Sequence, residues 1–323
     1  MAFYFIGFPH PDANAASEII QSLLTYDAVE FWSGAWFVEM PDHPERCVQG
    51  LFVARAFVME FDARTAAFFG GPVAAQARLF VAEKLGPAMV ASRPEAERQL
   101  SVHYCGEGER VFSDAVERYR QADPDGSRTT PLCRIMMQRG SDKGVGWHNY
   151  TTFYAQLFAD RIDSTHVVFE VGLGTNNTDV TSNMGEAGVP GASLRGWRDF
   201  FPAAAIYGAD IDRRILFQDD RIRTFFVDQT LPASFASLWR ELPELGIDLF
   251  IDDGLHTFEA ARTTFEESVR RMRPGGLYII EDVWARHADA YLDLLTERGY
   301  SGLFLKLPHP LNIHDNGLIV AQT

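Results

Sequence analysis

The sequence has few cysteines, no long apolar run and no surplus of basic side chains. Its three cysteines, Cys47, Cys105 and Cys133, are too few and too far apart for a disulfide framework or a zinc site. No apolar stretch approaches the ~20 residues that span a bilayer, and the first residues lack the basic start of a secretory signal. The 44 acidic and 29 basic residues leave a formal net charge of -15, which would repel nucleic acid and anionic lipid. We therefore expect a cytoplasmic protein with reduced thiols that binds neither nucleic acid nor membrane.

The remaining composition is that of an ordinary globular protein, on a chain long enough for two domains. Hydrophobic residues make up 46% and charged residues 23% of the 323 positions. The polar Pro/Gly/Ser segment 121–131 is typical of a linker, so we place a domain boundary near residue 125. Strand-like stretches at 2–8, 35–40 and 54–61 and helix-like stretches at 16–26 and 74–86 predict that residues 1–125 form a small α+β domain.

Downstream of this boundary, apolar runs alternate with helical segments. The runs cover residues 166–172, 204–210, 223–228, 247–253, 276–282, 302–307 and 317–322. Continuous apolar runs that end in glycine or an acid are typical of strands buried on both faces of a parallel sheet. Helices are expected over 193–201, 231–242, 256–272 and 283–299, with Ser193 as a cap of the first and Pro274-Gly275-Gly276 as the end of the third. The pattern predicts an α/β fold with a seven-stranded sheet in residues 126–323.

Polar residues at the ends of the first three runs outline a nucleoside-shaped site. Gly172 and Gly174 follow the first run and would let the backbone pass close to a ligand. The dinucleotide fingerprint requires a third glycine where this chain has Asn177, which disfavours NAD. Asp210 ends the second run, where it could accept both ribose hydroxyls, and Asp228 ends the third, where it could reach an adenine amino group. An acid at a strand end can also be merely solvated or cap the following helix.

A second polar group follows the fourth and fifth runs and contains Asp253, His256, Glu281 and Asp282. Adjacent parallel strands would bring these positions within about 5 Å of one another. Carboxylates that close repel each other unless a cation lies between them, and hard oxygen ligands suit Mg²⁺. His256 lies three residues after Asp253, where it could act as a general base. Its alternative role is to cap the helix that opens at Thr257.

The order of these motifs, EVGLG, YGADID, FFVDQT, DLFIDDGLH and PGGLYIIED, resembles the class I S-adenosylmethionine-dependent methyltransferases. More narrowly, DDGxH followed by an ED pair is similar to the macrocin/mycinamicin-type sugar O-methyltransferases, over roughly residues 134–323. The resemblance implies a Rossmann-like seven-stranded methyltransferase sheet with a smaller α+β N-terminal domain.

The resemblance also implies a role for each candidate site residue. The segment 140–154 is similar to the family's element that folds over the cofactor ahead of the sheet. The implied residues for S-adenosyl-L-methionine are Glu170, Gly172, Gly174, Asp210, Asp228, Lys143 and Tyr150; those for Mg²⁺ are Asp253, Glu281 and Asp282; the implied catalytic base is His256. Segment 176–191 departs from the common pattern, and a loop of this length is typically a lid or a substrate contact.

The leading hypothesis is a Mg²⁺-assisted O-methyltransferase acting on a hydroxyl of a sugar or sugar-containing small molecule, with a histidine base. One alternative is a metal-independent methyltransferase acting on a carboxylate, phosphate or amine. Another is a non-catalytic cofactor-binding assembly subunit. A hydroxylase is disfavoured because the sequence shows no 2-His-1-carboxylate triad for iron. The aromatic-rich residues 1–125 predict a subunit interface, and hence a homo-oligomer, or a cover for the acceptor pocket.

Overall fold

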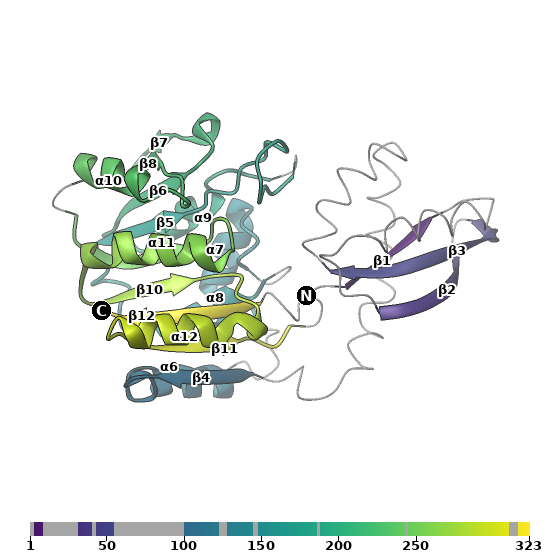
Figure 1. Ribbon diagram of the computed structural model, residues 1–323, viewed down its shortest axis with the longest axis horizontal. Helices are drawn as coiled ribbons and strands as arrows, with labels where there is room; N and C mark the ends of the chain where they lie inside the picture. The colour runs from purple at the N-terminus through teal and green to yellow at the C-terminus, as the bar shows by residue number, and fades with distance from the viewer. Residues whose placement is uncertain are drawn as a thin grey trace. The chain divides into compact units, whose positions relative to one another are not determined.

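The computed structural model describes residues 100–122, 128–144, 148–185, 188–242, 245–309 and 316–323, and the backbone of three N-terminal strands (Figure 1). The chain divides into two compact units, Met1–Arg98 with Pro310–Ile313, and Gln99–His309 with His314–Thr323. In the first unit, β1 (Phe3–Phe8), β3 (His43–Ala54) and β2 (Trp32–Met40) form an antiparallel sheet in that order. The expected strands at 2–8 and 35–40 are present. The expected helices at 16–26 and 74–86 lie outside the described residues, and so does the expected strand at 54–61 apart from Ala54, which ends β3.

The second unit contains a nine-stranded sheet in the order β4-β11-β12-β10-β9-β5-β6-β8-β7. Its bounds are β4 Ser101–Cys105, β5 Val167–Val171, β6 Ala205–Asp210, β7 Gln218–Asp219, β8 Ile222–Phe226, β9 Ile247–Asp252, β10 Met272–Ile280, β11 Ser301–Lys306 and β12 Gly317–Gln322. The central strands β10, β9, β5, β6 and β8 are parallel, and the outer pairings are antiparallel. All seven expected strands are present, so the Rossmann-like α/β fold is confirmed, with β4 and β7 added at the edges.

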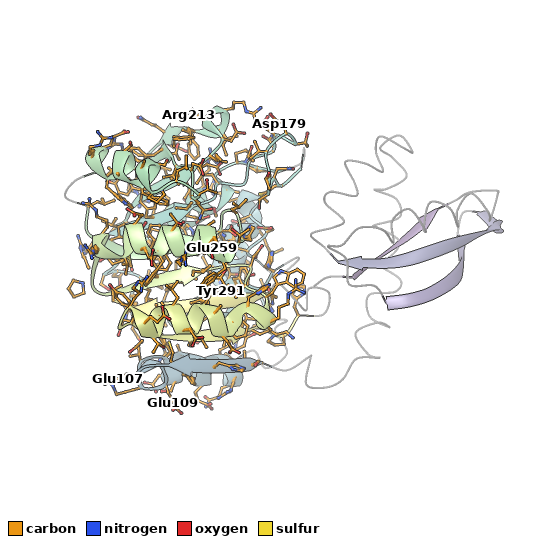
Figure 2. All side chains as sticks on the ribbon, in the orientation of Figure 1. Glu107, Glu109, Asp179, Arg213, Glu259 and Tyr291 are labelled. Carbon is orange, nitrogen blue, oxygen red and sulfur yellow. The ribbon has the colours of Figure 1, made fainter. Side chains whose placement is uncertain are left out.

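Helices cover both faces of this sheet, as the alternation of buried side chains along its strands requires. Successive strand residues point to opposite faces, so Val168 packs in one core cluster and Phe169 in the other. The first face carries α6 (Gly108–Ala122), α7 (Pro131–Arg139), α8 (Tyr150–Leu157) and α9 (Ala192–Phe200). The second face carries α10 (Pro232–Glu241), α11 (Phe258–Ser268) and α12 (Ala288–Glu297) (Figure 1). Figure 2 adds the described side chains in the same view, with Glu259 of α11 and Tyr291 of α12 labelled. Among the described residues, no helix combines the length and apolar composition needed to cross a bilayer.

Two local expectations were wrong. The segment Pro274-Gly275-Gly276 does not end the third helix, because α11 is followed by a 3-10 turn, Val269–Arg271, and the segment lies inside β10 at a register shift between Met272 and Leu277. Ser193 does not cap α9, because Gly191 occupies the N-cap position with φ +70°.

The division between the two compact units lies upstream of the boundary we expect near residue 125. β4 pairs with β11, and α6 packs on α8 and β11, so both elements are part of the second unit. The polar segment 121–131 therefore connects α6 to α7 within that unit. A polar Pro/Gly/Ser composition is typical of surface connections, which occur within a domain as well as between domains.

Candidate active site

The candidate active site lies at the carboxyl ends of β5, β9 and β10. From β5 the chain places β6 and β8 on one side and later β9 and β10 on the other, so the strand order reverses between β5 and β9. Open α/β sheets bind ligands at such a point. Val171 lies beside Asp252 in the register, and Asp252 lies beside Ile280. The residues that follow these three strands are consequently neighbours, as the sequence predicts.

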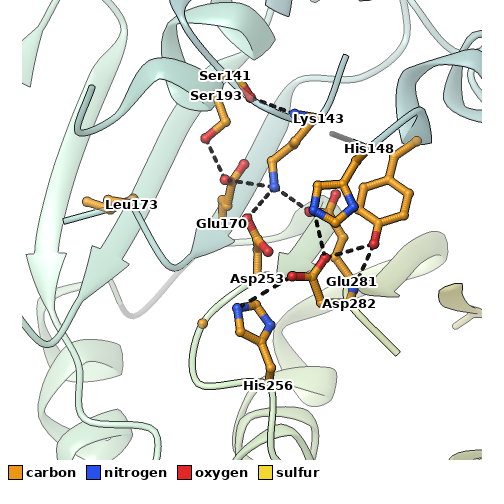
Figure 3. A network of polar contacts seen from close by, with 12 residues as sticks. Ser141, Lys143, His148, Glu170, Leu173, Ser193, Asp253, His256, Glu281 and Asp282 are labelled. Carbon is orange, nitrogen blue, oxygen red and sulfur yellow. Dashed lines mark hydrogen bonds and ion pairs between the residues drawn. The ribbon is translucent and has the colours of Figure 1, made fainter. Parts of the chain in front are cut away.

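Lys143 lies at the centre of this group. Its side chain is 2% exposed, and its Nζ atom lies 2.5 Å from Asp253 Oδ2 and 3.6 Å from Glu170 Oε1 (Figure 3). The same ammonium donates a hydrogen bond to Glu281 Oε2. Burial alone would lower the pKa of this amine, but the three carboxylates raise it well above its ordinary value. Lys143 is therefore a buried ammonium shared by acids from three strands.

The turn after α7 directs Lys143 into the site. Thr130 caps the start of α7 by accepting a hydrogen bond from the Cys133 N–H at 3.1 Å. Gly140 ends the helix in the left-handed conformation, with φ +84°. The Ser141 N–H then donates to Met136 O at 3.0 Å, which closes the helix end. Lys143 follows Gly140 by three residues, and its side chain reaches Asp253 at the end of β9.

Glu170 and Glu281 point inward and are fully buried. Glu170 accepts hydrogen bonds from Ser193 Oγ at 2.5 Å and from the Trp197 indole. Glu281 accepts one from the Tyr154 hydroxyl at 2.6 Å. Burial raises the pKa of both carboxyls, against the lowering effect of the neighbouring ammonium. Ser193, expected to cap a helix, instead holds an acid of the site.

Asp253 and Asp282 face outward and meet His256. Their side chains are 23% and 15% exposed, and that of His256 is 28% exposed. One ligand atom from each of the three lies within 4.8 Å of the others. Asp282 Oδ1 accepts a hydrogen bond from the Tyr150 hydroxyl at 2.7 Å and lies 3.5 Å from His148 Nε2. This outward group is the part of the cluster that can hold a cation.

Two residues of the outward group have unusual backbones. His256 has φ +58° and Asp282 has φ +57°, a region that non-glycine residues adopt at a cost of about 1–3 kcal/mol. Such strain gathers at functional sites, where the surrounding structure holds it in place. The cap of α11 is Thr257, which accepts from the Ala260 N–H at 3.3 Å. His256 is thus not the helix cap, and its side chain lies beside Asp282 instead (Figure 3).

Gly172 and Gly174 are required by close approaches of the protein itself. Gly172 has φ +94°, and a Cβ atom there would lie 2.0 Å from the Asp253 carbonyl oxygen. Gly174 has φ +71°, and its Cβ would lie 2.2 Å from Met184 Sδ. The first glycine therefore lets the backbone after β5 pass close to the backbone after β9. The second lets Met184 pack against the glycine turn.

Asp210 and Asp228 lie at the ends of β6 and β8, apart from the lysine cluster. Asp210 is 7% exposed and accepts hydrogen bonds from the Leu173 N–H at 2.7 Å and the Asp212 N–H at 2.8 Å. Burial raises its pKa. Asp228 accepts from the Thr230 N–H at 2.9 Å and from its hydroxyl at 2.6 Å, just before α10. Asp210 holds the glycine turn, and Asp228 shapes the turn that leads into α10.

Segment 176–191 is anchored by Asp212, a residue that the sequence analysis did not single out. Asp212 Oδ2 accepts from Thr175 Oγ1 at 2.6 Å and Asn177 Nδ2 at 2.7 Å. A hydrogen bond from Arg214 holds the pKa of Asp212 well below its usual range. Farther along the segment, Ser182 Oγ donates to Gly254 O at 3.1 Å. The signal in the sequence was the second acid of YGADID, two positions after Asp210.

Gln229 is a second residue that the sequence analysis missed. Its Nε2 donates to Asp252 Oδ1 at 2.6 Å, and its Oε1 accepts from the Leu255 N–H at 2.7 Å. These bonds fix the turn that carries Asp253 and His256. Asp252 itself is buried, and burial raises its pKa to about 6. Gln229 stands in the FFVDQT motif directly after Asp228, but nothing in that motif indicates that its amide reaches Asp252.

Several curated proteins are similar to part of this chain. The 8-demethyl-8-alpha-L-rhamnosyl tetracenomycin-C 2'-O-methyltransferase of Streptomyces olivaceus is 34% identical over 194 residues, which are 57% of this chain and 48% of that protein. Demethylmacrocin O-methyltransferase of Streptomyces fradiae is 35% identical over 140 residues, 43% of this chain and 33% of that protein. The chain resembles the sugar O-methyltransferases of antibiotic pathways.

This resemblance is partial in length. Mycinamicin VI 2''-O-methyltransferase of Micromonospora griseorubida is 34% identical over 162 residues, 50% of this chain and 38% of that protein. The chain thus spans about half or less of the curated relatives it matches. A solved structure of the MycE methyltransferase from the mycinamycin biosynthetic pathway, in complex with Mg, SAH and mycinamycin VI, is 26% identical with a TM-score of 0.46, covering 61% of this chain and 54% of that one. No family model matches the chain.

Proposed function

We propose that the protein is an S-adenosylmethionine-dependent O-methyltransferase that methylates a hydroxyl of a sugar-bearing small molecule with the help of Mg²⁺. The observation that carries this proposal is the convergence of Asp253, His256 and Asp282 at the sheet's switch point, next to the glycine turn. The similarity to the tetracenomycin-C and macrocin O-methyltransferases supports a sugar as the acceptor.

The cofactor would lie along the glycine turn. Gly172 and Gly174 allow the turn its left-handed backbone, Glu170 would mark the methionine end, and Asp210 and Asp228 would mark the ribose and adenine ends. Because Asp210 already accepts two backbone hydrogen bonds, its remaining lone pairs would serve the ribose. Lys143 and Tyr150, assigned to the cofactor by resemblance, both touch acids of the cluster, so their effect on the cofactor would be through Glu170 and Asp282.

The acidic cluster fits a hard cation. Asp253 and Asp282 present carboxylate oxygens within 4.8 Å of each other, and Glu281 shares an ammonium with Asp253. Asp253 and Asp282 would hold Mg²⁺ in the outward group, and Glu281 would be the third acid, on the buried side of the ion. The ion would lower the pKa of a bound substrate hydroxyl. The acceptor oxygen then forms its bond to the methyl carbon as the methyl–sulfur bond breaks, and the hydroxyl proton passes to the His256 imidazole. Asp282, 3.8 Å from His256 Nε2, stabilises the imidazolium that results.

A second candidate is a metal-independent methyltransferase, and one observation favours it. The Lys143 ammonium contacts both Asp253 and Glu281 and offsets part of their negative charge. In that case the acids would orient the ammonium, and a nucleophile needing no deprotonation, such as a carboxylate, would accept the methyl group by proximity.

The discriminating experiment is methyl transfer from labelled S-adenosylmethionine to a panel of rhamnosylated and other glycosylated acceptors, with EDTA or with Mg²⁺. We expect no transfer in EDTA and full transfer with Mg²⁺. His256→Ala should reduce the maximal rate about 10²–10⁴-fold at unchanged cofactor affinity. His287→Ala, an exposed histidine, is the matched control. Full transfer in EDTA would favour the metal-independent candidate.

Two further features of the protein belong to this proposal. The free thiols of Cys105 and Cys133 support a reducing compartment, the cytoplasm. The aromatic-rich N-terminal region supports a homo-oligomer with that region at the interface. Light scattering on the full-length chain tests the second feature, and a monomer at micromolar concentration would refute it.

A further inference from the structure

One ammonium and one proposed metal ion would use the same carboxylate. Asp253 Oδ2 lies 2.5 Å from Lys143 Nζ, and Asp253 also supplies a ligand atom to the outward group with His256 and Asp282. Lys143 contacts Glu281 as well, which is the third acid proposed for Mg²⁺. Figure 3 shows Lys143 reaching down between Glu170, Asp253 and Glu281, with His256 on the far side of Asp253.

The ammonium is well fixed in this position. Its side chain is 2% exposed, and Glu170 and Glu281 are themselves held by Ser193 and Tyr154. A partly dehydrated cation is strongly repelled by a second cation a few ångströms away, because the effective dielectric constant there is far below that of water. A divalent ion that binds Asp253 must therefore either displace the ammonium or bind less tightly because the ammonium repels it.

We propose that Lys143 is a built-in competitor of the divalent cation, an inference that rests on the Mg²⁺ site of the proposed function. The ammonium holds Asp253 and Glu281 together before the ion arrives and weakens the ion's affinity once it binds. Lys143 is thus a positioning residue that sets how tightly the site retains its metal. A purely structural lysine would stabilise the fold but would not oppose the ion.

The test is the affinity of the full-length chain for Mn²⁺, measured from the electron paramagnetic resonance signal of the free ion. Lys143→Met should bind Mn²⁺ roughly ten- to a hundredfold more tightly than the unmodified chain, because the repelling charge is gone. It should also melt at a lower temperature in EDTA and regain more of that loss on adding Mn²⁺. Lys143→Arg keeps the charge and should retain weak binding.

Arg298→Gln is the charge-matched control, since Arg298 pairs with Glu266 on the surface, and it should leave Mn²⁺ affinity unchanged. If Lys143→Met does not fold, Lys143→Gln, whose amide still donates to the two carboxylates, should show the same gain. Unchanged or weaker binding in the folded variant would overturn the inference and leave the proposed function intact. Absence of Mn²⁺ binding in every protein would refute the metal site, and the inference with it.

Discussion

Tyr150 and Asp282 are joined by two hydrogen bonds that run in opposite directions. The Tyr150 hydroxyl donates to Asp282 Oδ1 at 2.7 Å, and the Asp282 backbone N–H donates to the same hydroxyl oxygen at 3.2 Å. The pair ties the start of α8 to the end of β10 and fixes Asp282 in its left-handed backbone conformation. A residue that precedes the parallel strands in the sequence therefore positions one of the acids proposed for Mg²⁺.

Tyr150→Phe should weaken Mn²⁺ binding by about ten- to a hundredfold, because a hydrogen bond to a charged group contributes roughly 1.5–3 kcal/mol. S-adenosylhomocysteine affinity should change much less, as measured by calorimetry on the same samples. Tyr278→Phe is the control, because the buried Tyr278 hydroxyl makes no hydrogen bond within the part of the chain that the structure describes. Loss of cofactor affinity with metal affinity intact would show that Tyr150 serves the cofactor directly.

Asp252 should make the folded protein less stable as pH rises from about 4 to about 6. Burial raises its pKa from 3.8 to about 6, so the folded state holds a proton that the unfolded state releases across this window. The favourable contribution is complete below pH 3.8 and lost as pH rises through about 6. Asp252→Asn removes this titration. Between about pH 4 and pH 6, the free energy of unfolding of the variant should therefore fall by about 3 kcal/mol less than that of the unmodified chain.

Urea unfolding in EDTA across pH 4–7 measures this difference, since the chelator keeps metal from masking it. Asp220→Asn is the control, because the Asp220 side chain is 82% exposed. If the Asp252→Asn profile runs parallel to that of the unmodified chain, burial does not shift this carboxyl.

A fragment covering residues 99–323 should be more stable than one covering 126–323. The shorter fragment loses β4, which extends the sheet beside β11, and α6, whose Phe112, Val116 and Tyr119 are buried in the core. Each such side chain contributes about 1.5–3 kcal/mol. Thermal unfolding followed by circular dichroism compares the two. Equal melting temperatures would place the boundary of the stable unit downstream of α6.

The sheet could be predicted from the sequence because its strands are buried on both faces and read as continuous apolar runs. β4 could not, because it is a short edge strand whose partner, β11, lies far along the chain. β7 could not, because it is only two residues long, although it pairs with the neighbouring β8. The expectation that Pro274-Gly275-Gly276 ends a helix was wrong for another reason. Glycine and proline signal a break in regular structure, and a bulge inside β10 accommodates them as well as a helix end does.

The part of the candidate site that lies at the strand ends could be predicted from the sequence. Asp253, Glu281 and Asp282 follow neighbouring strands, so their proximity follows from the topology. The pairing of Lys143 with Asp253 joins residues that lie far apart in the chain and are brought together only by packing of the segment between α7 and α8. Gln229 was missed because a single amide that fixes a turn leaves no pattern in the sequence.

Calorimetric titration of the full-length chain with S-adenosylhomocysteine, and separately with NAD⁺, tests the central claim most directly. We predict micromolar binding of S-adenosylhomocysteine, about -8 kcal/mol, and no binding of NAD⁺. Asp210→Ala should weaken the former roughly ten- to a hundredfold, while Asp220→Ala leaves it unchanged. Binding of NAD⁺ without binding of S-adenosylhomocysteine would contradict the proposed methyltransferase and leave only the α/β fold standing.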